Sequence, residues 1–235
     1  MRNWDLYLIT EESLSAGRKT IEVVKEAALA GVDVIQLREK NLSLRERFQL
    51  GKEIKKICQK YNIDFIVNDR VDLALALDAD GVHLGQSDLP LRSARKILGP
   101  DKIIGLTAWR NGEIRAAEAE GADYLGVGAI FKTKSKRLNP DKNGIGISGI
   151  EAIRRQTELP LVAIGGLNQH NSAEVISSGA DVISVITAIT KADEIGVQTA
   201  RLKKIIEQAK NQRRALNCQQ KLIRIKKNLV GTLKS

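Results

Sequence analysis

In the stretch Ala30-Gly31-Val32-Asp33-Val34-Ile35-Gln36-Leu37-Arg38, a predicted helix gives way to a predicted strand. Similar joints recur at Glu120-Gly121-Ala122-Asp123 and Ser178-Gly179-Ala180-Asp181, and Ala79-Asp80-Gly81 is a rearranged version. A glycine at this point suits a helix C-terminus that needs a positive φ. The repeated joint indicates regular helix–strand units, and we expect its residues to stabilise the loops, not to bind a ligand.

Short β-branched runs alternate with longer helical patterns through most of the chain. Apolar residues recur at spacings of three and four in the helical runs Thr20–Ala30, Leu44–Tyr61 and Ile150–Thr157. The eight expected strands are Leu6–Thr10, Val34–Arg38, Phe65–Asn68, Gly81–Leu84, Ile103–Thr107, Tyr124–Val127, Leu161–Ile164 and Val182–Val185. Strands that alternate with helices indicate parallel βαβ units. A doubly wound sheet would give the same order, but eight regular units favour an α/β fold that closes into a single (β/α)₈ TIM barrel.

Composition divides the chain into a barrel domain at residues 1–209 and a basic tail at residues 210–235. Hydrophobic residues make up 43% and aromatic residues only 3%, so we expect an aliphatic core. The tail holds eight Lys/Arg and no Asp/Glu, which leaves 30 basic and 28 acidic residues, a net charge of +2, for the body. No apolar run reaches the ~18–20 residues of a membrane span, and the N-terminus lacks a signal-peptide pattern. We therefore expect a cytoplasmic protein without a membrane span.

Polar residues gather where predicted strands end, which is where barrels carry their chemistry. Gln36, Arg38 and Lys40 share one phase after the second strand, and two cations with an amide suit a diphosphate. A solvated charged loop would have the same composition. Asp69 and Asp88 follow adjacent strands, where two carboxylates could share Mg²⁺ with water and phosphate oxygens. A helix N-cap is the alternative for either aspartate.

The last three strands lead into segments suited to anions. Lys132–Arg137 holds four cations and two hydroxyls, which is typical of a loop that closes over substrate or of a plain basic surface loop. Gly165-Gly166 follows the seventh strand and Ile186-Thr187 follows the eighth, as in the usual barrel phosphate site. Together with the diphosphate cluster, this pattern predicts two phosphorylated small-molecule substrates. His83 lies within a strand, and we expect it to be packed and not catalytic.

Four segments together resemble the thiamine-phosphate synthase family, namely Gln36–Lys40, Val67–Asp72, Gly81–Asp88 and Thr133–Lys136. The resemblance runs from about Leu6 to about Lys210. It implies a transferase that displaces diphosphate from hydroxymethylpyrimidine diphosphate with a thiazole nitrogen. It also implies a dissociative path with Mg²⁺ on the diphosphate, in which the diphosphate leaves before the new bond forms.

The resemblance implies a role for each candidate residue. Asp69 and Asp88 would hold Mg²⁺, while Lys136, Arg38 and Thr107 would be the catalytic residues. The substrate contacts would be Gln36 and Thr107 for the pyrimidine, Arg38, Lys40, Asn68 and Lys136 for the diphosphate, and Thr133, Ser135, Gly166, Ile186 and Thr187 for the thiazole phosphate. Three positions depart from the family pattern: Trp109 replaces a histidine, Thr107 a serine and Lys132 a proline.

Two alternatives compete with this interpretation. A thiazole tautomerase on the same barrel would keep a phosphate site, but it would need a proton-transferring side chain where Trp109 stands. A nucleic-acid or membrane-surface binder would rely on the tail, whose apolar residues fall at spacings of four, three, four and four: Cys218, Leu222, Ile225, Leu229 and Leu233. Because the body is nearly neutral, we expect no nucleic-acid partner. A homo-oligomer is compatible with the sequence.

Overall fold

A computed structural model describes residues 3–133 and 144–232, with side chains described up to residue 219. The strands are β1 (Leu6–Ile9), β2 (Val34–Leu37), β3 (Asp64–Asn68), β4 (Gly81–Leu84), β5 (Ile103–Thr107), β6 (Tyr124–Gly128), β7 (Leu161–Ile164) and β8 (Val182–Val185). The helices are the 3₁₀ turn η1 (Glu12–Leu14), α1 (Thr20–Leu29), α2 (Leu44–Tyr61), α3 (Val71–Ala76), α4 (Leu91–Leu98), α5 (Asn111–Glu120), α6 (Gly146–Arg154), α7 (Ser172–Ser177), α8 (Thr187–Thr190) and α9 (Ile195–Thr232).

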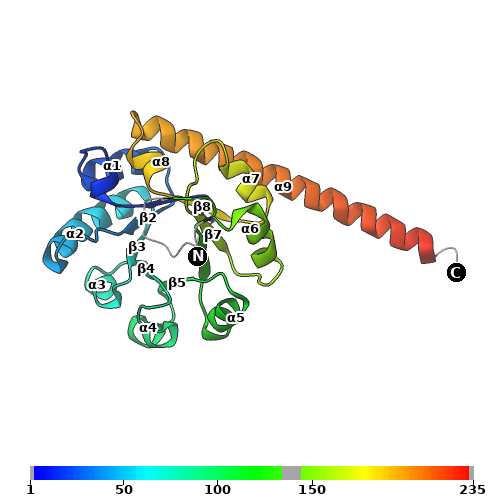
Figure 1. Cartoon of the computed structure of the whole chain (residues 1–235), viewed down its shortest axis with the longest axis horizontal. Coiled ribbons are helices and arrows are strands. Elements are labelled where there is room, and N and C mark those ends of the chain that lie inside the picture. The colour runs from blue at the N-terminus through cyan, green and yellow to red at the C-terminus, as the bar shows by residue number, and fades with distance from the viewer. Residues whose placement is uncertain (1–2, 134–143, 233–235) are drawn as a thin grey trace.

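The strands form a closed parallel barrel with helices around it (Figure 1). Each strand pairs with the next, and β8 pairs with β1 through the register Tyr7↔Ser184. The predicted (β/α)₈ barrel is therefore confirmed, and every predicted strand boundary lies within one residue of the observed one. The third predicted helix begins earlier than expected, at Gly146, because its first turns contain Gly146 and Gly149, which weaken the helical signal in the sequence.

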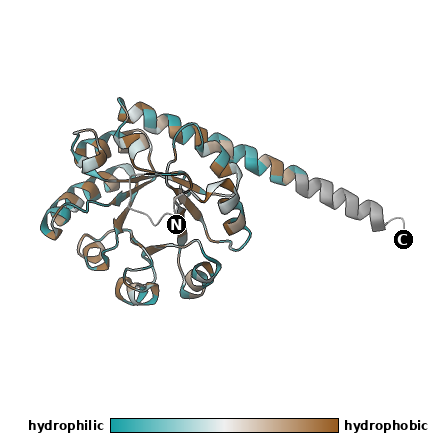
Figure 2. Ribbon diagram, in the orientation of Figure 1, coloured by the Kyte–Doolittle hydropathy of each residue, from teal (hydrophilic) through white to brown (hydrophobic). Residues whose placement is uncertain are grey.

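Two hydrophobic clusters build the core, and the outer one is predominantly aliphatic, as expected. The outer cluster fills the space between strands and helices with residues such as Ile54, Leu84 and Ile183. Figure 2 shows the strands as predominantly hydrophobic. The inner cluster, inside the ring of strands, is built around Trp4 and Tyr7 and includes Tyr124. The expectation of an aliphatic core therefore does not hold for the barrel interior, where three of the nine buried residues of the inner cluster are aromatic.

The repeated joint has a structural role at the N-terminal ends of the strands. Gly31, Gly121 and Gly179 all have positive φ, as the helix ends require. An aspartate precedes each even-numbered strand, and its carboxylate accepts a hydrogen bond from a backbone N–H near the start of the preceding odd-numbered strand. The pairs are Asp33 with Leu6, Asp80 with Phe65, Asp123 with Ile104 and Asp181 with Leu161. Each carboxylate also pairs with a cation, namely Lys203, Lys55, Arg95 and Arg154 in the same order. These residues stabilise the barrel, as the sequence predicts.

We expect Asp123→Ala to lower the free energy of unfolding by about 1–2 kcal/mol, because the buried N–H of Ile104 loses its acceptor. Its kinetic constants should stay within about twofold, since strand N-termini lie away from barrel catalytic sites. Urea denaturation of this variant and of Asp101→Ala, an exposed neighbour, measures the difference. Equal stability of the two variants would contradict the assigned role.

Helix α9 continues through the expected boundary between residues 209 and 210. Lys210 is 7% exposed, and its Nζ donates to the Trp4 carbonyl oxygen at 2.6 Å and to Asp5. Arg213 donates to the carbonyl oxygens of Ile176 and Ala180 at 2.8 and 2.7 Å. The helix then projects away from the barrel (Figure 1), and the described side chains from 214 to 219 are exposed. Contact with the barrel therefore extends to Arg213.

Deleting residues 216–235 should leave activity within about threefold and the melting temperature unchanged, since the described part of that segment is exposed. Deleting residues 211–235 should also destabilise the barrel by about 1–3 kcal/mol, because the Arg213 contacts are lost. Thermal unfolding and activity assays of both truncations compare the two outcomes. Loss of soluble protein after the shorter deletion would show that the apolar stripe of the tail covers core surface.

Among the described helices, none combines the length and apolar character that a bilayer span requires.

Candidate active site

A cavity of about 550 Å³ opens at the carboxyl ends of the strands. Every predicted site residue in the described part of the chain lines it: Gln36, Arg38, Lys40, Asn68, Asp69, Asp88, Thr107, Thr133, Gly166, Ile186 and Thr187. Ser135 and Lys136 lie outside the described residues. The closed barrel thus brings together side chains that the sequence distributes over some 150 positions.

The aspartates Asp69 and Asp88 lie at the tops of β3 and β4. Burial raises the pKa of the Asp88 carboxyl, and the neighbouring Asp69 carboxylate raises it further. Lys40 Nζ lies 3.5 Å from Asp69 Oδ2. The Gly85 N–H donates to Asp88 Oδ2 at 2.6 Å, which orients that carboxylate. Two carboxylates and a cation therefore meet at one side of the cavity mouth.

The N-cap alternative for these aspartates is wrong. Helix α3 has Arg70 as its N-cap and α4 has Pro90, and neither position makes a side-chain cap bond. Asp69 adopts a left-handed conformation with φ of 64°, an arrangement that few residues other than glycine, asparagine and aspartate accept. Both carboxylates are thus held at the cavity and not at helix ends.

Arg38 is held in place by an acidic partner that the sequence prediction missed. The Arg38 side chain is only about a tenth exposed, and its Nη1 donates to Glu11 Oε2 at 2.5 Å. The Arg38 backbone N–H donates to Thr10 Oγ1 at 3.0 Å. A buried guanidinium with a fixed counterion keeps one orientation toward the cavity. Glu11 therefore positions Arg38.

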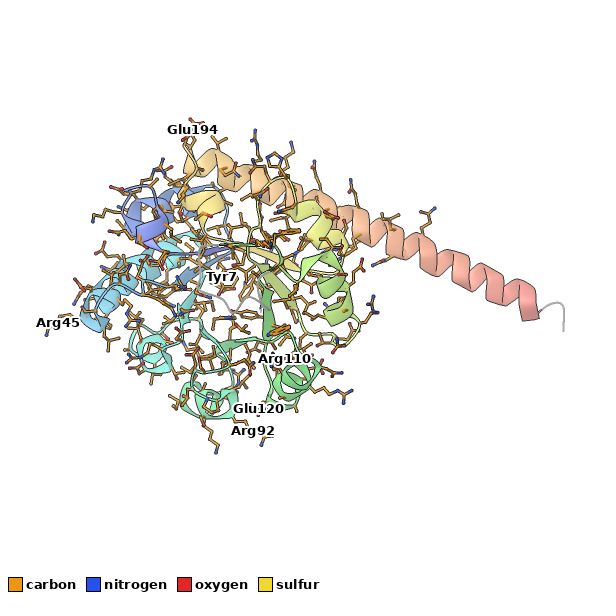
Figure 3. The ribbon with its side chains drawn as sticks, in the orientation of Figure 1. Tyr7, Arg45, Arg92, Arg110, Glu120 and Glu194 are labelled. Carbon is orange, nitrogen blue, oxygen red and sulfur yellow. The ribbon has the colours of Figure 1, made fainter. Side chains whose placement is uncertain are left out.

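Gln36 and Thr107 belong to the floor of the cavity. Gln36 Nε2 donates to the Tyr7 hydroxyl at 2.7 Å, and the Thr107 hydroxyl lies 3.0 Å from His83 Nε2. Figure 3 shows Tyr7 at the centre of the barrel, enclosed by the strands. His83 is half-buried and lines the cavity, so the expectation of a merely packed side chain is incomplete.

The opposite side of the cavity is shaped by glycines after β7. Gly165 and Gly166 have φ of 104° and 67°, and a Cβ at Gly166 would lie 2.8 Å from Phe131 Cβ. Only glycine fits this close approach of two loops. Ile186 and Thr187 complete this side at the start of α8. Ser184 Oγ, at the cavity wall, is buried and has no hydrogen-bond partner among the described residues.

Comparison with known proteins decides the family. A family model described as thiamine monophosphate synthase matches residues 6–189. The thiamine-phosphate synthase of Moorella thermoacetica is 47% identical over 210 residues, which cover 89% of this chain and 99% of that protein. The chain belongs to the thiamine-phosphate synthase family. Its members are transferases of thiamine biosynthesis.

Further similarities agree with membership of the thiamine-phosphate synthase family. The thiamine-phosphate synthase of Haloarcula marismortui is 46% identical over 211 residues, covering 89% of this chain and 100% of that protein. The solved thiamine phosphate pyrophosphorylase from Pyrococcus furiosus is 40% identical, with a TM-score of 0.80 over 88% of this chain and 97% of that one. A 3-hexulose-6-phosphate synthase at 17% identity and a TM-score of 0.65 shares the fold alone. The names of these relatives do not support the tautomerase alternative.

Positions that depart from the thiamine-phosphate synthase pattern lie in or beside the cavity. Trp109 lines the cavity, and the Arg110 guanidinium stacks over its ring at 4.8 Å from the centroid. Thr107 keeps the hydroxyl of the expected serine and uses it toward His83. Lys132 is exposed. These departures therefore leave in place a hydroxyl group at position 107 and the carboxylate pair of Asp69 and Asp88.

Sequence reasoning missed four residues at the cavity: Tyr7, Tyr124 and His83, which line it, and Glu11, which contacts Arg38. A signal for the tyrosines was present, because Tyr7 and Tyr124 occupy inward phases of two strands in a chain with only three tyrosines. Glu11 carries no comparable signal, because nothing in the sequence distinguishes it from the neighbouring Glu12.

Proposed function

We propose that this protein joins 4-amino-2-methyl-5-hydroxymethylpyrimidine diphosphate to 4-methyl-5-(2-phosphoethyl)thiazole, giving thiamine phosphate and diphosphate with the help of Mg²⁺. One observation carries the proposal. A single cavity holds an acidic pair with cations at one side and a glycine-lined end at the other. Two different anions, a metal-bound diphosphate and a monophosphate, fit these two ends.

The residues at the acidic end fit a magnesium ion. Asp69 and Asp88 lie close enough for one carboxylate to raise the pKa of the other, so a cation between them would relieve like-charge repulsion. Carboxylate oxygens completed by water and phosphate are the usual ligands of Mg²⁺. Bound there, the ion would neutralise charge on the departing diphosphate.

The remaining groups act by electrostatics and positioning. Arg38, Lys40 and Asn68 face the diphosphate, and Glu11 fixes the guanidinium so that its charge is already in place when the bond breaks. Gly166 and the backbone at Ile186 and Thr187 hold the thiazole phosphate, with Thr133 and Ser135. No general base is required, because the attacking thiazole nitrogen carries a free lone pair.

The decisive experiment incubates the purified protein with both substrates and Mg²⁺ and detects thiamine phosphate by mass spectrometry. Omission of either substrate, or addition of EDTA, should abolish the product. Isomerisation of a thiazole phosphate without any pyrimidine substrate would instead establish the tautomerase alternative.

We expect Glu11→Gln to lower kcat/KM for the pyrimidine diphosphate about 10-fold, because Arg38 loses its charged partner and its fixed orientation. The matched control is Glu12→Gln, which removes the adjacent, more exposed carboxylate that pairs with Lys19. Surface pairs of that kind contribute about 0–1 kcal/mol. Steady-state kinetics of both variants tests whether Glu11 positions Arg38. Equal values of kcat/KM for Glu11→Gln and Glu12→Gln would refute that role.

A further inference from the structure

A continuous chain of hydrogen bonds crosses the barrel at the floor of the cavity. Gln36 Nε2 donates to the Tyr7 hydroxyl, which lies 3.1 Å from the Tyr124 hydroxyl. The Tyr124 hydroxyl lies 3.0 Å from His83 Nδ1, and His83 Nε2 lies 3.0 Å from Thr107 Oγ1. This hydrogen-bond chain thus joins Gln36 on β2 to Thr107 on β5, two side chains at the floor of the cavity.

The donor at Gln36 sets the direction of every later bond. Because the Tyr7 oxygen accepts from Gln36, its own hydrogen is available to Tyr124, whose hydrogen then goes to His83 Nδ1. In this direction Nδ1 accepts, and a neutral His83 carries its ring proton on Nε2 and donates it to Thr107. If Tyr124 donated to Tyr7 instead, the Tyr7 oxygen would accept from both neighbours. The buried Tyr7 hydrogen would then have no acceptor, which costs about 1–3 kcal/mol. Burial also raises the pKa of both tyrosines, so both keep their protons.

Glycines in two strands leave space for the two rings in the middle of the hydrogen-bond chain, those of His83 and Tyr124. The His83 and Tyr124 rings stack with centroids 5.5 Å apart and an interplanar angle of 19°. A Cβ at Gly105 would lie 2.0 Å from Tyr124 Cζ, and one at Gly126 would lie 2.6 Å from His83 Cε1. Both rings therefore occupy space that only glycine leaves open, which restricts their movement.

We propose that Tyr124 and His83 are positioning residues that fix which hydrogen-bonding groups Gln36 and Thr107 present to the pyrimidine, and so select an aminopyrimidine over an oxopyrimidine. The inference rests on the proposed function. With its nitrogen engaged by Tyr7, Gln36 offers its Oε1 as an acceptor to the amino group. Thr107, which accepts from His83, offers its own hydrogen to a ring nitrogen. An oxo group in place of the amino group would set two acceptors against each other.

A nuclear magnetic resonance measurement tests the direction of the chain without any substrate. The protein has two histidines, so a ¹⁵N-labelled sample gives two imidazole patterns, and His170→Asn assigns them. We expect His83 to be a single neutral tautomer with its proton on Nε2. Tyr124→Phe should give a mixture of tautomers. Tyr61→Phe alters the one tyrosine that takes no part in the hydrogen-bond chain, and its spectrum should match that of the wild type. A wild-type proton on Nδ1 would overturn the proposal.

A binding measurement tests the selectivity. The dissociation constants of the 4-amino and 4-oxo pyrimidine diphosphates are compared in the wild type, Tyr124→Phe and Tyr61→Phe. We expect the preference of the wild type for the amino compound to fall about 10-fold in Tyr124→Phe, because Tyr7 can then donate to Gln36 and let its amide turn over. Affinity for the thiazole phosphate should stay unchanged.

The outcomes separate this inference from the proposed function. An equal loss of affinity for all three ligands in Tyr124→Phe would overturn the inference, because it would mark a general structural role. Absence of thiamine phosphate from the wild-type reaction would overturn the proposed function, while the tautomer of His83 would still report the direction of the chain.

Discussion

Asp69→Asn and Asp88→Asn should each lower turnover by at least about 10²-fold, because the departing diphosphate loses the ion that neutralises it. Asparagine is the better probe at position 69, where φ is 64°, since alanine there would add backbone strain. At position 88 it keeps an oxygen that can accept from the Gly85 N–H. Both variants should therefore remain folded while they lose turnover at fixed Mg²⁺.

Asp72→Asn is the matched control, because Asp72 is an exposed carboxylate near the same strand end that pairs with Arg70. Its turnover should stay within about twofold of the wild type. Titration calorimetry with Mg²⁺ and diphosphate should show binding to the control and loss of binding in the two site variants. Full activity of the wild type in EDTA would contradict the metal assignment altogether.

The fold could be predicted because its signals are local. A glycine that ends a helix and an aspartate that begins a strand, as at Gly121 and Asp123, mark the joints without any knowledge of distant contacts. The convergence of Asp69 and Asp88 follows from topology, since parallel neighbours end at the same edge. The placement of the described candidate residues in one cavity was therefore within reach of sequence reasoning.

The residues that sequence reasoning missed act through contacts between distant parts of the chain. Tyr7 and Tyr124 meet across 117 residues, and Lys210 meets Asp5 across 205. A composition change placed the tail boundary at residue 210, yet the cations Lys210 and Arg213 bind the barrel. Charge composition does not distinguish a lysine that binds a distant carboxylate from one in water.

The segment that contains Lys136 starts and ends beside the cavity. Thr133 lines the cavity, and the chain is described again at Gly144, whose N–H donates to the Ala129 carbonyl oxygen at 3.0 Å. Lys136 itself lies outside the described residues. It is three residues from Thr133, a distance that the chain spans in at most about 11 Å. We therefore keep the role that the family resemblance implies for Lys136, contact with the diphosphate, as the hypothesis to be tested.

Lys136→Ala should cut kcat by roughly 10²-fold with a much smaller change in affinity for the pyrimidine diphosphate. If the diphosphate leaves before the new bond forms, negative charge on it grows most in the transition state. A cation placed there then raises turnover more than it tightens binding of the ground state. Lys132→Ala and Lys134→Ala are the matched controls and should lose far less, because they remove charge from the same segment without that placement. Equal, modest losses in all three variants would show instead that the segment supplies only a diffuse positive potential.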